Sequence, residues 1–110
     1  MKTLYTYIYK NGKIDRKETL VKETEKLYRV AKRNEFLPGI FGSQIAKSEL
    51  PKIEEHSYFF EMSYTTDSPL SEDIVIQAFR NRLIEKVARA KIEADKMLEK
   101  LEEFEEATKG

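Results

Sequence analysis

Residues 71–106 decide the fold, and they read SEDIVIQAFRNRLIEKVARAKIEADKMLEKLEEFEE. This stretch contains no Gly or Pro, the residues that most often interrupt a helix. From Ile76 onward, apolar side chains recur at alternating spacings of four and three residues, with Arg80 as the one exception. This spacing is the heptad pattern of a coiled coil. We call this set the apolar seam; its members are Ile76, Arg80, Leu83, Val87, Ala90, Ala94, Met97, Leu101 and Phe104.

The apolar seam predicts a partner helix. The sequence shows no second helical pattern of comparable length, so the facing helix is expected to come from another copy of the chain, in a dimer or a higher homo-oligomer. The alternative is that the stripe packs only on the chain's own sheet. Extra apolar residues beside the first half of the seam, such as Val75 and Phe79, widen the stripe there. We therefore expect the first turns of the helix to cover a sheet and the remainder to project.

Charge is segregated along the predicted helix. Residues 80–91 carry five cations and one acid, whereas acids outnumber cations in residues 93–106. An antiparallel pair of helices would place the basic half of one copy against the acidic half of the other, with Ala90 facing Ala94. A parallel pair would place Lys100 beside Glu105 of the second copy. Both orientations remain open at this point.

Composition limits the class of protein. With 110 residues, of which 40% are hydrophobic, the chain is expected to form one domain with a modest core, a sheet over residues 1–67 and a helix over 68–107. Lys and Arg together number 20, as do Asp and Glu, which argues against nucleic-acid binding. There is no Cys, no apolar run near the ~20 residues of a membrane span and no signal-like start. These features predict a cytoplasmic protein.

A β-hairpin is predicted at the start of the chain. Residues 3–10 alternate aromatic with β-branched or aliphatic side chains, which is typical of a strand. Asn11-Gly12 follows, the dipeptide that suits a two-residue type I′ turn. This turn would place Tyr9 opposite Ile14 and Tyr7 opposite Arg16.

The middle of the chain predicts further strands. Residues 18–31 fit either a helix or two short strands, and we favour strands because the hairpin already commits the preceding residues to a sheet. Residues 43–47 and 56–64 are expected to be strands, with a turn at 48–51 and a loop at 65–69. The predicted class is therefore α+β: a small antiparallel sheet of about four strands, followed by one long helix.

An apolar loop with one Pro and two Gly occupies residues 36–42, FLPGIFG. Such a composition is incompatible with regular structure. Its large apolar side chains are expected either to plug the end of the sheet or to line a ligand site.

Motifs for catalysis are absent from the sequence. His56 is the only histidine and there is no Cys, so one chain cannot provide a dedicated zinc site. Neither a G-x-S-x-G elbow, a P-loop nor a G-x-G-x-x-G motif occurs. These observations predict binding without catalysis, cofactor or metal.

The best candidate binding site lies in the first half of the predicted helix, with a contribution from the sheet. It combines an aromatic ring, an amide that can read the edge of a base and Arg side chains suited to phosphate, which are the groups that a nucleotide needs. The alternative is that Phe79 is a core residue and that Arg80 extends to water. The candidate ligand-binding residues are Phe79, Arg80, Asn81, Arg82, Arg29 and Tyr28.

A family resemblance follows from the order of these elements. The hairpin, the Tyr28-Arg29-Val30 strand, the segment IAKSEL at 45–50, the aromatic strand and the long charged helix resemble small accessory proteins of Gram-positive phages and prophages. Within that group the chain is most similar to the Thoeris anti-defence sponges. The resemblance implies an oligomer that sequesters a cyclic ADP-ribose-type signal through an aromatic residue, an Asn and Arg residues, types that Phe79, Asn81, Arg82 and Arg29 match.

The sequence therefore supports two candidate functions. The first is a phage-encoded anti-defence protein that binds and sequesters a host cyclic nucleotide immune signal without hydrolysing it. The second is an inhibitor that contacts a host or defence enzyme, either through the acidic helix end at residues 99–106 or through the aromatic face of the sheet.

Overall fold

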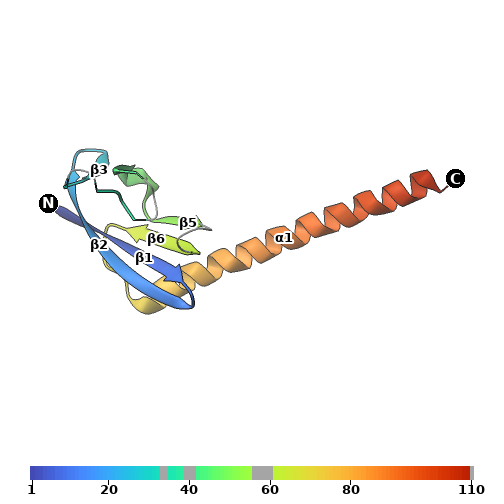
Figure 1. The fold of residues 1–110 in the computed structure, drawn as a ribbon, viewed down its shortest axis with the longest axis horizontal. Helices are drawn as coiled ribbons and strands as arrows, with labels where there is room; N and C mark the ends of the chain where they lie inside the picture. The colour runs from blue at the N-terminus through green and yellow to red at the C-terminus, as the bar shows by residue number, and fades with distance from the viewer. Residues whose placement is uncertain (33–34, 39–41, 56–60, 110) are drawn as a thin grey trace. The chain divides into compact units, whose positions relative to one another are not determined.

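The computed structural model describes residues 1–32, 35–38, 42–55 and 61–109. Within these residues, six antiparallel strands form one sheet in the order β4-β3-β2-β1-β6-β5, and one long helix follows (Figure 1). The predicted α+β class is thus confirmed, with six strands where about four were expected. The elements are β1 Lys2–Lys10, β2 Lys13–Glu23, β3 Leu27–Val30, β4 Gln44–Ala46, the 3₁₀ turn η1 Lys47–Glu49, β5 Lys52–Glu55, β6 Met62–Thr66 and α1 Glu72–Thr108.

The β1–β2 hairpin has the predicted register. Asn11 has φ 51° and Gly12 has φ 77°, so both turn residues adopt the left-handed conformation of a type I′ turn. Tyr9 pairs with Ile14 and Tyr7 with Arg16, as expected from the position of the turn. The hairpin continues as far as the pair Lys2 and Val21, which makes β1 and β2 the two longest strands.

The ambiguous segment at residues 18–31 is β-structure, as favoured. Its first part extends β2, because β1 supplies backbone partners there, and Val21 pairs with Val30 of β3. Thr24 closes the turn between β2 and β3: its N–H donates to the Leu27 carbonyl at 2.9 Å, and its hydroxyl accepts from the Leu27 N–H at 3.0 Å. Pairing with neighbouring strands thus decides the conformation of this segment, whose local pattern also fits a helix.

The second half of the sheet differs from the prediction. Of the strand expected at 56–64, residues 56–60 lie outside the described part, and β6 extends to Thr66 where a loop was expected. The prediction also missed β5. It is a charged edge strand in which Ile53 pairs with Tyr64, and edge strands need little apolar character to pair. At the opposite edge of the sheet, the strand expected at 43–47 is present as β4.

Side chains from distant strands meet in the interior because the sheet curls. Tyr28 lies on β3, two strands away from β1, yet its hydroxyl donates to Asp67 Oδ2, just beyond β6, at 3.4 Å. The Thr6 and Thr65 hydroxyls share a buried hydrogen bond of 3.3 Å. The main apolar cluster consists of Leu4, Val21, Tyr28, Leu37 and Ile45.

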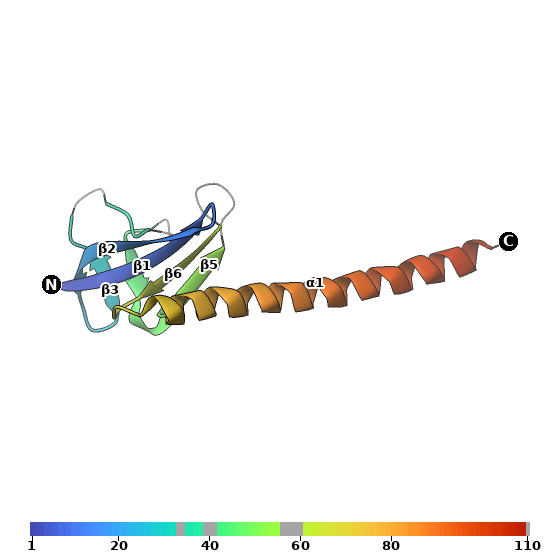
Figure 2. The ribbon, with the colours of Figure 1, turned by 90° about the horizontal axis from the view of Figure 1, so that it is seen from below.

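The helix α1 is 37 residues long and continuous (Figure 2). It begins after Ser71, whose carbonyl accepts a hydrogen bond from Val75 N–H at 3.2 Å, and Glu72 and Asp73 place negative charge at its positive end. Its predicted extent is therefore confirmed to within a few residues. The chain divides into two compact units, Met1–Val75 and Ile76–Gly110. In the described part of the chain, no helix is long and apolar enough to cross a bilayer.

Candidate functional site

A hollow of about 450 Å³ lies beside β3 in the first compact unit. We call it the Phe36 hollow, and it is lined chiefly by Arg29, Lys32, Glu35, Phe36 and Ser43. Its volume falls within the range of small-molecule sites. It combines an aromatic ring, two cations and one carboxylate, which is a mixture suited to a ligand with both a flat ring and a negative charge.

Backbone hydrogen bonds build the walls of the Phe36 hollow. Val30 N–H donates to the Ser43 carbonyl at 2.8 Å, so that the segment before β4 continues the pairing with β3. Glu35 N–H reaches the Lys32 carbonyl at 3.4 Å, and Leu37 N–H donates to the Gly42 carbonyl at 2.7 Å. These bonds hold the chain on both sides of Phe36.

In the apolar loop at 36–42, the described residues Phe36 and Leu37 have different surroundings. Leu37 is buried in the main apolar cluster and plugs the interior. The neighbouring Phe36 is 65% exposed and lines the hollow. Ile40 and Phe41 lie outside the described residues. Much of the Phe36 side chain is therefore open to solvent and available for contact with a ligand.

Arg29, a predicted ligand-binding residue, lies in the Phe36 hollow. Its Nη2 donates to Gln44 Oε1 at 3.1 Å, which fixes the guanidinium on the surface of the sheet. A guanidinium has five N–H donors, so this bond to Gln44 is compatible with a second acceptor such as a phosphate oxygen. Lys32, two residues beyond the end of β3, adds a second positive charge.

Tyr28, by contrast, is a core residue. Its ring is buried, and Lys47 Nζ lies 5.2 Å from the ring centroid while pairing with Glu23 Oε1 at 2.6 Å. Burial of the ring raises the pKa of Tyr28, and the negative charges of Asp67 and Glu23 raise it further. Lys47 lowers the pKa of Glu23 through its hydrogen bond and its charge. This group of residues stabilises the sheet and offers no open ring face to a ligand.

The other predicted site residues belong to the second compact unit. Phe79 is only 4% exposed, so its ring has little surface on which a base could stack. Arg80 is exposed, and Asn81 Oδ1 accepts from Gln77 Nε2 at 2.9 Å. Arg82 Nη1 lies 4.0 Å from Glu85 Oε2. On α1, the exposed groups of the predicted site are therefore polar and charged.

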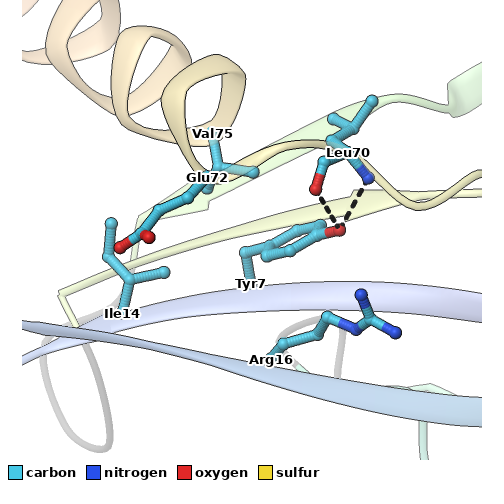
Figure 3. A pocket seen from close by; sticks show the side chains of 6 residues that line it. All are labelled: Tyr7, Ile14, Arg16, Leu70, Glu72 and Val75. Carbon is cyan, nitrogen blue, oxygen red and sulfur yellow. Dashed lines mark hydrogen bonds between the residues drawn. The ribbon is translucent and has the colours of Figure 1, made fainter.

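A second hollow, of about 320 Å³, is formed by Tyr7, Ile14, Arg16, Leu70, Glu72 and Val75 (Figure 3). The Tyr7 hydroxyl accepts from Leu70 N–H at 2.8 Å and donates to the Leu70 carbonyl at 3.3 Å. Arg16 already contacts Glu18 Oε1 at 3.3 Å and the Tyr5 ring, at 5.0 Å from its centroid. These contacts give the hollow a structural role, in which Tyr7 holds the chain that enters α1.

Neither Glu35 nor Ser43 was predicted as a site residue. Lys32 was considered as one of the basic residues beside Tyr28 and Arg29, and Phe36 belongs to the apolar loop that was expected either to plug the sheet or to line a ligand site. The available signal was a basic stretch directly before an apolar loop, but only the fold shows that Ser43 and Arg29 face the same space. His56 lies outside the described residues, and the described residues contain no group of three metal-ligating side chains. Comparison with protein-family models, curated proteins and solved structures gives no match. Function is therefore inferred from the residues and their geometry.

Proposed function

We propose that this protein is a non-catalytic binding protein that assembles through α1 and sequesters a host cyclic nucleotide immune signal of the cyclic ADP-ribose type. In this proposal it is a phage-encoded anti-defence protein that acts in the cytoplasm of the host cell. The exposure of the apolar seam along most of α1 carries the proposed assembly, and the aromatic ring and two cations of the Phe36 hollow support a nucleotide as the ligand.

The seam is exposed in a single copy of the chain. Val87 is 69% exposed, and Leu83, Met97, Leu101 and Phe104 are also exposed. Monomeric proteins rarely leave a long continuous apolar stripe in water. A stripe with heptad spacing is best covered by a second helix with the same spacing.

Charge complementarity supports a second copy of the chain as the occupant. An antiparallel partner places the basic residues 80–91 against the acidic residues 93–106 and brings the small residues Ala90 and Ala94 together at the centre. In this register Lys86 faces Lys100 of the second copy, and the repulsion between these like charges slightly weakens the association. The net attraction between the two halves favours this arrangement over the parallel one.

Assembly is tested by size-exclusion chromatography with light scattering. The wild-type chain is expected to have at least twice the 12.9 kDa mass of one copy at micromolar concentration. Val87→Glu places a charge in the seam and is expected to give single copies. Ile92→Glu is the matched control, because Ile92 is exposed but lies off the seam. A wild-type mass of one copy contradicts the proposal.

Sequestration is tested by isothermal titration calorimetry. The panel consists of cyclic ADP-ribose isomers together with cyclic di- and trinucleotides. We expect one of them to bind, and to be recovered unchanged after the protein is denatured. Absence of heat across the whole panel would rule out the sponge, and a hydrolysed product would show an enzyme.

The exposed acidic end of α1 favours a second candidate function. Residues 99–106 carry five acids, and Phe104 is exposed among them. Such a surface suits a basic patch on a host or defence enzyme. The test is inhibition of a defined defence enzyme by the wild-type protein and its loss in Glu102→Lys/Glu106→Lys, with Glu18→Lys on the sheet as control. Equal inhibition by all three proteins would exclude the acidic end as the contact.

A further inference from the structure

We propose that the Phe36 hollow is the nucleotide site, that it binds a purine nucleotide, and that α1 does not supply the main contacts. This inference rests on the proposed binding of a nucleotide and assigns its position. The base would stack on Phe36, while a phosphate would lie between Arg29 and Lys32.

An accessible aromatic ring supports this position for the base. Of the two rings in the predicted site, Tyr28 and Phe79 are both buried, whereas Phe36 is exposed and lines the hollow. Stacking requires an accessible ring face, and every base offers one in return. The exposed phenyl ring thus supplies what the buried rings cannot.

Two positively charged side chains support this position for the phosphate. Arg29 is held in place by Gln44 at 3.1 Å, so little side-chain entropy is lost when it binds a phosphate. Lys32 lies two residues beyond the end of the same strand and lines the same space. Two cations that line the same hollow as an aromatic ring match a phosphate attached to a base through a sugar.

Glu35 favours a base that carries an exocyclic amino group. A carboxylate that lines the hollow repels phosphate but accepts hydrogen bonds from an amine. An exocyclic amino group, as in adenine, satisfies this acceptor, whereas the carbonyl oxygen of hypoxanthine at the same position does not. The hollow should therefore prefer adenine nucleotides to inosine nucleotides.

The decisive experiment is calorimetric titration of wild-type and variant proteins with cyclic ADP-ribose and cyclic di-AMP. Phe36→Ala is expected to weaken binding about tenfold or more through loss of stacking, and Phe36→Tyr to retain it. Lys32→Glu should weaken binding, whereas Lys17→Glu, an equal charge change at an exposed residue of β2, should not. Phe36 and Lys32 are exposed, so these variants are expected to fold normally.

The outcomes separate the site from the function. If the wild-type protein binds one of these nucleotides and Phe36→Ala and Lys32→Glu bind equally well, the sponge stands and the Phe36 hollow is not its site. If Arg80→Ala or Arg82→Ala weakens binding instead, the site lies on α1. If the wild-type protein binds neither nucleotide, the assignment of the hollow is overturned.

The role of Glu35 is tested with AMP and IMP. A weaker affinity for IMP than for AMP in the wild-type protein, and equal affinities in Glu35→Gln, support this role.

Discussion

At the scale of single residues, the environment of a side chain decides what its chemistry can do. Tyr28 and Phe36 are both aromatic residues near Arg29, and the sequence favoured Tyr28 as a ligand contact. In the fold, the Tyr28 ring enters the interior and its hydroxyl finds an acceptor in Asp67. Phe36, although wholly apolar, remains on the surface. Of these two rings, only that of Phe36 is therefore accessible to a ligand.

Tyr28 should make stability depend on alkaline pH. The folded chain holds the phenol proton more tightly than the unfolded chain, because burial raises the pKa above its usual 10.0. This stabilisation is fully present below pH 10 and is lost as the pH rises above 10 towards the higher folded-state pKa. Denaturant titrations from pH 8 to 11 should show a steeper loss for the wild-type protein than for Tyr28→Phe. Parallel curves would show that the folded pKa is not raised.

Leu4 and Leu20 allow a matched test of the core. Leu4 is 0% exposed on β1, whereas Leu20 is 49% exposed on β2. Leu4→Ala should lower the free energy of unfolding by about 2–5 kcal/mol because it leaves a cavity. The same change at Leu20 should cost less than about 0.5 kcal/mol. Urea unfolding at one protein concentration measures both, and similar costs would contradict the assigned faces of the strands.

At the scale of elements, the hairpin and the helix depend on local patterns to different degrees. The β1–β2 turn is set by two adjacent residues that tolerate a positive φ. The helix α1 is set by 37 residues without Gly or Pro. The short strands β4 and β5 have no strong pattern of their own, and each forms because a neighbouring strand offers free backbone groups.

Gly12 should be the more sensitive of two loop glycines. Its φ is +77°, and an added Cβ would meet no atom within 4 Å, so the cost of Gly12→Ala is conformational. We expect a loss of about 1–2 kcal/mol in the free energy of unfolding. At Gly42 an added Cβ would lie 3.8 Å from the Gln44 carbonyl oxygen, an ordinary contact. Thermal unfolding of both Ala variants makes the comparison, and equal stability would argue against the type I′ turn.

At the scale of the whole molecule, the proposal joins two properties that lie in different units of the chain. The Phe36 hollow belongs to the unit Met1–Val75, and the whole apolar seam belongs to the unit Ile76–Gly110. Each property can therefore be removed by substitutions that leave the other intact. A variant that no longer assembles, such as Val87→Glu, should still bind nucleotide through the hollow.

The orientation of the proposed helix pair can be measured with one spin label. In the antiparallel register, residue 103 of one copy lies opposite residue 81 of the other, so two labels at residue 103 are separated by 22 residues, roughly 33 Å along the helix. In a parallel pair they would approach the roughly 10 Å spacing of packed helix axes. Because the chain has no native Cys, Glu103→Cys can be labelled alone. We expect the long distance in pulsed dipolar spectroscopy; the short one would require parallel pairing.

The sequence alone determined the features that depend on residues close together in the chain. The helix, the hairpin turn and its register, and the α+β class all come from backbone preferences and side-chain periodicity over a few residues. The preference for strands at residues 18–31 also succeeded, because it followed from the adjacent hairpin.

Only the tertiary structure decided which side chains are buried and which share a space. The curl of the sheet carries Tyr28 towards Asp67, and the pairing of β3 with the segment before β4 brings Ser43 beside Arg29 and Lys32. These contacts join residues far apart in the chain. Their free energy comes from burying apolar surface and satisfying backbone groups across strands, and no local pattern encodes it.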